Sequence, residues 1–285
     1  MVTKRVGIVG SGIMGSGIAE IAARNGFEVV LRSRQQATAD SMVAGLEKSL
    51  GKQVERGKLS EEDRTSTLGR VSATSDLGEL AACDLVIESV VEDLPTKKEL
   101  FNELDRICGE GTILATNTST LPIIEMAMET GRPQKVCGIH FFNPAPMMAL
   151  VEVVRPLTAD DETIAEAKAF AEACGKSPVE VKDQAGFIVN ALLFPYLNNA
   201  VRLLENGVAT REDIDEAMKG GCNFPMGPLA LLDLVGLDTS LAIIEALYAE
   251  FRDPNYAPVP LLKRMVAAEQ LGRKSGRGFY DYHKG

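Results

Sequence analysis

The sequence predicts an α/β fold, in which a mostly parallel sheet is followed by an all-helical C-terminal domain. Short apolar runs alternate with helical patterns over roughly the first 180 residues, which is typical of parallel strands joined by helices. From residue 186 onward only helical patterns remain. The length of 285 residues is that of about two domains. We therefore expect one domain over residues 1–185 and a second, helical domain over residues 186–285.

The first strand leads directly into a glycine-rich turn. The apolar run Val6–Val9 is followed by the spacing GxGxxG and then by the helical pattern Ile13–Ala23. In such a turn the first glycine makes the tight bend, the second lets backbone N–H groups approach a pyrophosphate, and the third lets the helix pack on the strand. The positive helix N-terminus favours the phosphate charge. The sequence thus predicts a Rossmann-like domain that binds a dinucleotide, and a turn without a ligand is the alternative. The turn residues expected beside the cofactor are Gly10, Gly12, Ile13, Met14 and Gly15.

The remaining elements follow in chain order. Apolar runs predict further strands at residues 28–31, 71–73, 84–90, 112–116, 136–142, 150–154 and 178–181. In the first domain, periodic patterns predict helices at 37–56 and 60–68, which form a helical arm, and at 95–107. In the second domain, helices are predicted at 187–205, after the capping residue Thr210, at 227–249 and at 260–270.

Polar side chains stand at the ends of two predicted strands. Asn117 and Ser119 follow one strand, and His140 closes another. Since ligands bind at the carboxyl ends of parallel strands, we expect these groups to lie together. Glu152 interrupts an apolar strand, where a carboxylate is costly unless it is paired, and His140 is its natural partner. Such a pair suits a general base, although a core histidine and a solvent-facing edge carboxylate are the alternative.

The composition argues against several classes of partner. The net charge of −10 argues against nucleic acid and anionic membranes. Five cysteines without a CxxC motif are expected as free thiols in a reducing cytoplasm, and two histidines do not support a metal site. The N-terminus runs straight into the first strand, so no signal peptide is expected. Polar residues interrupt the apolar stretch 187–204, so no membrane span is expected and the predicted location is cytoplasmic.

Six motifs are spread along nearly the whole chain: Asn117-Thr-Ser-Thr, His140-Phe-Phe-Asn-Pro-Ala-Pro, Leu150-Val-Glu-Val, Gly186-Phe-Ile-Val-Asn, Pro225-Met-Gly-Pro and Lys274-Ser-Gly-Arg-Gly-Phe-Tyr. In their order and spacing these motifs resemble the L-3-hydroxyacyl-CoA dehydrogenase family, and most of all its short-chain, single-function 3-hydroxybutyryl-CoA dehydrogenases. The resemblance implies hydride transfer between a nicotinamide cofactor and C3 of a short acyl-CoA, interconverting acetoacetyl-CoA and (S)-3-hydroxybutyryl-CoA. It also implies a homodimer formed through the helical domain.

The same resemblance implies roles for individual residues. His140 is the catalytic acid/base, and Glu152 orients it. Ser119 donates to the 3-oxygen of the substrate, and Asn190 positions the substrate from the helical domain. From the residues alone, Asn190 is an amide in the first turns of an apolar helix, where a structural hydrogen bond is the default. The resemblance also places Glu92 and Lys97 at the cofactor, and its position at the end of a strand places Asn117 near the nicotinamide.

A basic stripe lies on the predicted helix 37–56. Lys48, Lys52 and Arg56 recur at intervals of four residues, and acidic residues flank them. An ordinary solvated helix face explains this pattern as well as a ligand does. By the resemblance the helix contacts CoA, with Ser49 and Arg56 at contact positions and Lys52 on the same stripe.

The end of the second strand departs from the usual pattern of NAD-binding domains. An acid there normally holds the adenosine ribose, but this chain has Arg32-Ser33-Arg34. A serine between two arginines accommodates a 2′-phosphate, so NADP(H) is favoured, with Ser33 and Arg34 beside the cofactor. NAD(H) with solvated arginines is the alternative. Two other functions stay open, a dehydrogenase for a carrier-protein thioester and a non-catalytic dinucleotide-binding protein.

Overall fold

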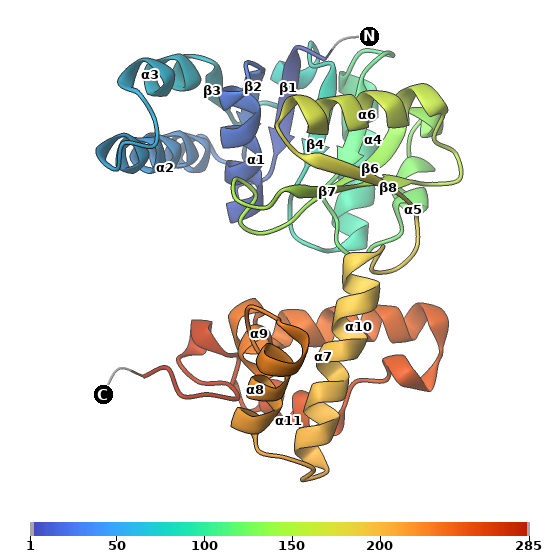
Figure 1. The fold of residues 1–285 in the computed structure, drawn as a ribbon. Coiled ribbons are helices and arrows are strands. Elements are labelled where there is room, and N and C mark those ends of the chain that lie inside the picture. Colours follow the sequence, from blue (N-terminus) through green and yellow to red (C-terminus); the bar gives the residue numbers. More distant parts are fainter. Residues whose placement is uncertain (1–2, 284–285) are drawn as a thin grey trace. The chain divides into compact units, whose positions relative to one another are not determined.

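The computed structural model describes residues 3–283 and consists of two compact units, Met1–Asp183 and Gln184–Gly285. Among the described residues the first unit contains an eight-stranded sheet with the order β3-β2-β1-β4-β5-β6-β7-β8 (Figure 1). Every neighbouring pair is parallel except β6 and β7, which are antiparallel. The predicted Rossmann-like, mostly parallel sheet is confirmed. The strands are β1 Arg5–Val9, β2 Glu28–Arg32, β3 Val71–Thr74, β4 Leu85–Glu88, β5 Ile113–Thr116, β6 Val136–Phe141, β7 Leu150–Arg155 and β8 Ser177–Lys182.

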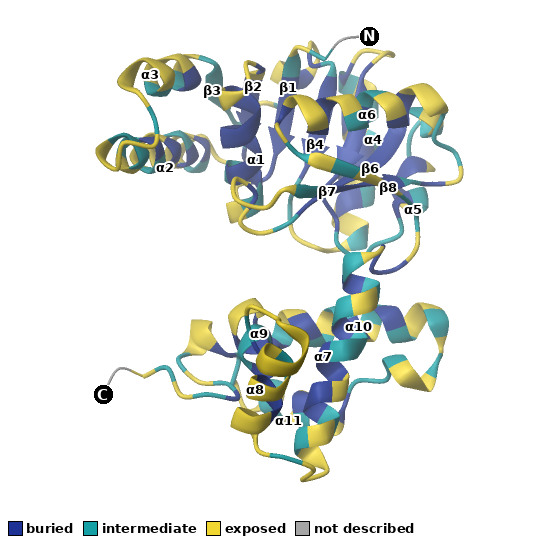
Figure 2. Ribbon diagram, viewed as in Figure 1, coloured by how far each residue is buried: buried dark blue, intermediate teal, exposed yellow. Residues whose placement is uncertain are grey.

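Helices cover both faces of this sheet, with α1 and α6 on one face and α4 on the other (Figure 1). The central strands β1 and β4 are therefore buried on both sides, which explains their continuous apolar runs (Figure 2). The sequence reasoning did not assign α5 and α6, and the Asp160 cap, which accepts a hydrogen bond from the Thr163 amide, was the available signal for α6. The helices of this unit are α1 Ile13–Arg24, α2 Gln36–Glu55, α3 Glu61–Gly69, α4 Leu94–Ile107, α5 Ile123–Ala127 and α6 Asp161–Ala173.

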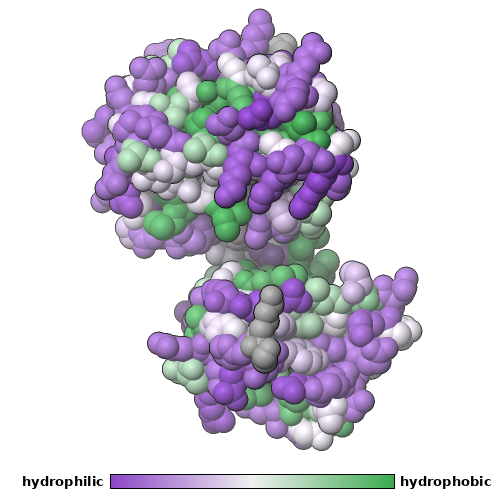
Figure 3. All heavy atoms as spheres, turned by 90° about the vertical axis from the view of Figure 1, so that its left-hand side faces the viewer, coloured by the Kyte–Doolittle hydropathy of each residue, from purple (hydrophilic) through white to green (hydrophobic). Residues whose placement is uncertain are grey.

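The predicted helical arm consists of α2 and α3, which pack against each other beside β3 (Figure 1). Ser60 caps α3 by accepting a hydrogen bond from the amide of Asp63. On α2 only one face is buried, through Met42, Leu46 and Leu50. The arm therefore presents a long polar surface, and hydrophilic side chains cover most of this side of the unit (Figure 3).

The second unit is built from helices, as predicted, but one predicted helix is wrong. Residues 227–249 form two helices because Gly236 has φ of +102°, a conformation that ends α9 and starts α10 in a new direction. In addition, α7 begins two residues later than predicted, after Phe187 with φ of +49°. The helices are α7 Val189–Glu205, α8 Arg211–Cys222, α9 Pro228–Val235, α10 Leu237–Phe251 and α11 Pro260–Ala267.

The C-terminal tail is pinned to a buried carboxylate of the second unit. Asp233, which is 1% exposed, accepts hydrogen bonds from the backbone amides of Phe279 and Tyr280 and from the hydroxyl of Tyr282. Burial raises the pKa of Asp233, and these donors oppose that shift. A Cβ atom at Gly278 would lie 1.9 Å from the Asp233 carboxylate, so only glycine lets the tail approach this closely.

Candidate functional site

The glycine turn has the geometry that a dinucleotide requires. A Cβ atom at Gly10 would lie 2.2 Å from the Ser89 carbonyl oxygen, and one at Gly15 would lie 2.3 Å from the Gly10 carbonyl oxygen. These two glycines let β1, β4 and α1 approach one another. At Gly12 no atom lies within 4 Å of that position, so the backbone is open to a phosphate. Beside the turn, Ile13 is 78% exposed, whereas Met14 packs against the core.

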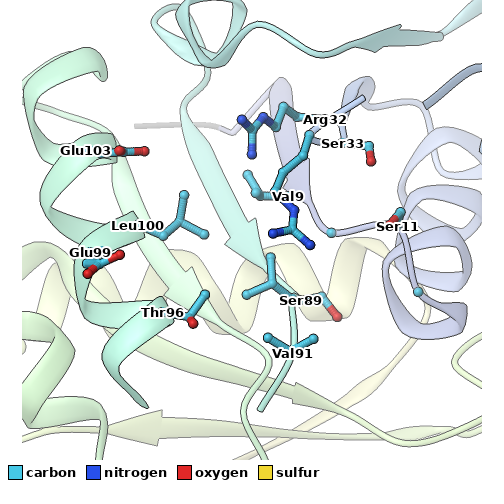
Figure 4. A pocket seen from close by; sticks show the side chains of 14 residues that line it. Val9, Ser11, Arg32, Ser33, Ser89, Val91, Thr96, Glu99, Leu100 and Glu103 are labelled. Carbon is cyan, nitrogen blue, oxygen red and sulfur yellow. The ribbon is translucent and has the colours of Figure 1, made fainter. Parts of the chain in front are cut away.

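A pocket of about 650 Å³ opens at the carboxyl ends of β1, β2 and β4. Its volume lies within the usual range for small-molecule sites, roughly 300–1,000 Å³. Figure 4 shows Arg32 on one side and Glu99, Leu100 and Glu103 of α4 on the other. The sequence reasoning did not identify these α4 residues, because a solvated helix face carries the same pattern. The lining residues are Val9, Gly10, Ser11, Gly12, Arg32, Ser33, Arg34, Ser89, Val90, Val91, Thr96, Glu99, Leu100 and Glu103.

The three residues that end β2 differ in exposure. Ser33 is buried, and its amide donates to the carbonyl of Thr74 at 3.1 Å. Arg34 is exposed. Arg32 is half-buried, and within the described part of the chain its Nε atom is buried with no hydrogen-bond partner. Desolvation lowers the pKa of Arg32, and the nearby carboxylate of Glu103 opposes that shift.

His140 and Glu152 face each other across β6 and β7. The antiparallel register pairs these two residues directly, so their side chains lie on the same face of the sheet. The Nδ1 atom of His140 lies 2.8 Å from Oε2 of Glu152, and the two residues are 5% and 1% exposed. The ring of Phe142 lies against the imidazole, with a centroid distance of 4.6 Å. The pairing expected from the isolated carboxylate in β7 is therefore present, and it fixes the imidazole orientation.

The loop after β5 is joined to both neighbouring strands. Asn117 accepts a hydrogen bond on Oδ1 from the amide of Phe141, next to His140, at 2.8 Å. Its Nδ2 donates to Oγ of Ser89 beyond β4 at 3.2 Å. Asn117 thus links the carboxyl ends of β4 and β6, and Ser119 follows it in the same loop.

A buried network lies behind this loop. Lys97 of α4 is 1% exposed, and its Nζ atom lies 2.7 and 2.9 Å from the two carboxylate oxygens of Glu88. It also lies 3.3 Å from Oε2 of Glu92. Among the α4 residues, Thr96 and Glu99 line the pocket, whereas Lys97 is enclosed by the two carboxylates. The sequence reasoning missed Glu88, a charge that ends the apolar run of β4 nine residues before Lys97.

Of the three residues expected to contact CoA, Ser49 and Lys52 line two different recesses of the first unit, whereas Arg56 lines neither. Ser49 lines a recess of about 480 Å³ that reaches Gly12 and Pro146, and its hydroxyl donates to Glu20 at 3.3 Å. Lys52 lines another recess, of about 450 Å³, together with Lys48 of α2 and Arg64 of α3. Arg56 is the exposed cap of α2. The structure therefore does not gather these residues in a single recess.

Asn190 belongs to the second unit, where it lies in the first turn of α7 and is 7% exposed. Over residues 3–283 no cluster of three or more histidine, cysteine, aspartate or glutamate side chains is arranged to hold a metal ion. In that same range no helix is both long enough and apolar enough to cross a membrane.

Comparisons with known proteins agree over the full chain. The family model of the 3-hydroxyacyl-CoA dehydrogenase NAD binding domain matches residues 5–184, and that of the C-terminal domain matches residues 186–282. A 3-hydroxybutyryl-CoA dehydrogenase of Mycobacterium tuberculosis is 50% identical over 281 residues, covering 98% of each chain. One from Clostridioides difficile is 49% identical over 280 residues, covering 98% of this chain and 100% of that protein. The crystal structure of (S)-3-hydroxybutyryl-CoA dehydrogenase from Ralstonia eutropha matches with a TM-score of 0.97 and 45% identity, covering 99% of this chain and 100% of that one.

Proposed function

The chain belongs to the 3-hydroxyacyl-CoA dehydrogenase family, and we propose that it interconverts acetoacetyl-CoA and (S)-3-hydroxybutyryl-CoA. A nicotinamide cofactor supplies the hydride to C3 of the substrate or accepts it from there. The short acyl chain is supported by the names of the full-length relatives, which are 3-hydroxybutyryl-CoA dehydrogenases. The residues of the first unit suit a dinucleotide, because the backbone at Gly12 is open and the pocket beside it has sufficient volume.

The observation that carries the proposal is the buried pair of His140 and Glu152 at 2.8 Å. Since Nδ1 of His140 faces Glu152, we assign the proton transfer to Nε2. In the oxidation His140 accepts the proton of the 3-hydroxyl group, and in the reduction it returns this proton to the oxygen. Glu152 stabilises the imidazolium, which forms in the oxidation and donates its proton in the reduction. Ser119 and Asn190 hold the 3-oxygen in line, so orientation contributes much of the rate.

For the cofactor we propose NADP(H), with NAD(H) as the alternative. The support is the absence of an acid at the end of β2 and the buried Nε of Arg32 without a protein partner among the described residues. Arg34 and Ser33 line the same pocket. Glu99 and Glu103 on the opposite side weaken the attraction for a 2′-phosphate, so we expect a preference rather than exclusion of NADH.

We further propose that Ser49, Lys52 and Arg56 contact the CoA moiety from α2. Lys52 and Arg56 are exposed cations, and a nucleotide phosphate is their natural partner. We also propose that the protein is a homodimer through the second unit, where Leu192, Leu203 and Val208 are exposed apolar side chains. Sedimentation equilibrium of the purified protein tests this assembly, and a monomer at all concentrations refutes it.

One assay tests the reaction. Acetoacetyl-CoA is offered with NADPH and with NADH in separate reactions, and oxidation of the cofactor is followed by absorbance. The His140→Ala variant should lower kcat by about 100-fold or more, the usual scale for an acid/base residue, while cofactor binding changes little. A parallel reaction with an acetoacetyl carrier-protein thioester tests the alternative substrate. No turnover with either thioester refutes the enzymatic function, and near-normal kcat of His140→Ala refutes the role of this histidine.

A further inference from the structure

We propose that Glu88 is a positioning residue, which acts through Lys97 and Glu92 to fix the backbone that carries Ser119. The inference rests on the proposed role of Ser119 in holding the 3-oxygen. It extends the site to a residue at the carboxyl end of β4 that contacts neither substrate nor cofactor in the proposed reaction.

Glu88 is a fully buried carboxylate with a complete set of donors. It is 0% exposed. Its Oε1 accepts hydrogen bonds from the Val90 amide at 2.6 Å and from Nζ of Lys97 at 2.7 Å. Its Oε2 accepts from the Thr116 hydroxyl at 2.7 Å and from the same Nζ atom at 2.9 Å. These contacts join the ends of β4 and β5 to the first turns of α4.

Lys97 connects this carboxylate to a second one. Its Nζ atom lies 3.3 Å from Oε2 of Glu92, which is more exposed than Glu88. With its ammonium held on one side by Glu88, the lysine has a fixed position from which to hold Glu92. Lys97 lies in the first turn of α4, which begins at Leu94, and the Asp93 cap fixes the backbone of this turn by accepting a hydrogen bond from the Thr96 amide.

Glu92 in turn binds the loop that carries Ser119. Its Oε1 accepts hydrogen bonds from the Thr118 hydroxyl at 2.6 Å, the Ser119 amide at 2.8 Å and the Thr120 amide at 3.3 Å. One carboxylate oxygen thus gathers donors from three successive residues. The loop conformation depends on the position of Glu92, and that position depends on Lys97 and Glu88.

A purely structural role would predict a different outcome on substitution. Replacing a buried ion pair with apolar side chains of similar volume is often neutral or stabilising, whereas removing one partner is strongly destabilising. Because Glu88 also accepts hydrogen bonds from the Val90 amide and the Thr116 hydroxyl, stability alone is served as well by a neutral pair, glutamine at position 88 and methionine at position 97, in which the glutamine still hydrogen-bonds both groups. The network instead serves precise placement, since a displacement of about 1 Å at a reacting group can cost roughly 100-fold in rate.

The test uses Glu88→Gln and the double variant Glu88→Gln/Lys97→Met. We expect Glu88→Gln to lower both the melting temperature and kcat, with kcat reduced by roughly 10- to 100-fold. The double variant should regain thermal stability, because no buried charge is left without its partner, but not kcat, because Glu92 has lost Lys97. Recovery of kcat together with stability refutes the proposal and leaves a structural ion pair. Asp105→Asn is the matched control, because it weakens the Asp105–Arg132 pair at the other end of α4 and should lower stability without lowering kcat.

A double-mutant cycle with Ser119→Ala tests whether Glu88 affects kcat through Ser119. If Glu88 acts through Ser119, Glu88→Gln lowers kcat much less in the Ser119→Ala background than in the wild type. Additive losses refute the positioning role and leave the proposed function intact. A Ser119→Ala variant with wild-type kcat instead refutes the role of Ser119 and with it this inference. Hydrogen exchange of residues 118–120 gives a readout that does not depend on activity, and Glu88→Gln should accelerate it there, whereas Asp105→Asn should not.

Discussion

Glutamine in place of Glu152 removes the charge beside His140 while keeping the shape of the side chain. The pair is 2.8 Å apart and almost fully buried, so water cannot replace the lost carboxylate. A hydrogen bond to a charged group contributes about 1.5–3 kcal/mol, and a neutral one about 0.5–1.5 kcal/mol. The imidazolium therefore loses about 1–2 kcal/mol of stabilisation, and kcat for the oxidation, the direction in which this imidazolium forms, should fall by roughly 5- to 30-fold.

Steady-state oxidation of (S)-3-hydroxybutyryl-CoA measures this loss, with the melting temperature recorded to confirm folding. The matched control is Glu180→Gln on the neighbouring strand β8, where the carboxylate pairs with Arg155 at the surface. This control should leave kcat unchanged. A folded Glu152→Gln enzyme with the kcat of the wild type would refute the assignment of Glu152 as the partner that stabilises the imidazolium.

Three other predictions concern the ligands and the thiols. Lys52→Glu should raise KM for acetoacetyl-CoA several-fold while kcat stays near normal, because the lysine binds a part of the substrate far from the reacting carbon. Added salt should raise KM of the wild type, and equal KM values for wild type and variant would show that Lys52 lies on a solvated helix face. Arg34→Ala should lower kcat/KM by roughly 10- to 150-fold with NADPH and little with NADH, and Ser33→Asp should turn the preference toward NADH; better use of NADH by the wild type contradicts this. Burial raises the pKa of Cys83, Cys137 and Cys174 to about 12 and that of Cys108 to about 11, so these thiols form thiolates only at strongly alkaline pH. A thiol reagent near neutral pH should therefore label only the exposed Cys222 of the native protein, and Cys222→Ser should abolish labelling.

The parts of the fold that sequence reasoning predicted correctly are those in which one strong local pattern decides the structure. The apolar runs of β1 and β4 have no alternative to burial, and the glycines after β1 admit only a tight turn. The helix over residues 227–249 was predicted wrongly because its apolar periodicity continues through Gly236. Only the positive φ at this glycine, set by tertiary packing, separates α9 from α10.

The residues of the candidate site also differ in whether the sequence could predict their contacts. A carboxylate inside the apolar strand β7 predicted a buried partner, and the cross-strand register brings His140 to it. The network of Glu88 could not be predicted from the sequence, because its members come from β4, α4 and the loop after β5, and only the three-dimensional arrangement brings them together. The basic stripe on α2 was equally ambiguous, because recesses between helices depend on how α1, α2 and α3 pack.

The pinned C-terminal tail imposes an order of events on biosynthesis. The first unit ends at Asp183, so its whole sheet is available for folding while the ribosome adds residues 184–282, over roughly 5 to 20 seconds at roughly 5–20 residues per second. The second unit, in contrast, needs residues close to position 280 before the hydrogen bonds of Asp233 can form. The carboxylate of Asp233 obtains its donors from Phe279, Tyr280 and Tyr282, which follow it by 46 to 49 residues. A nascent chain that stalls before Phe279 therefore carries the complete sheet of the first unit, whereas the buried carboxylate of the second unit still lacks these donors.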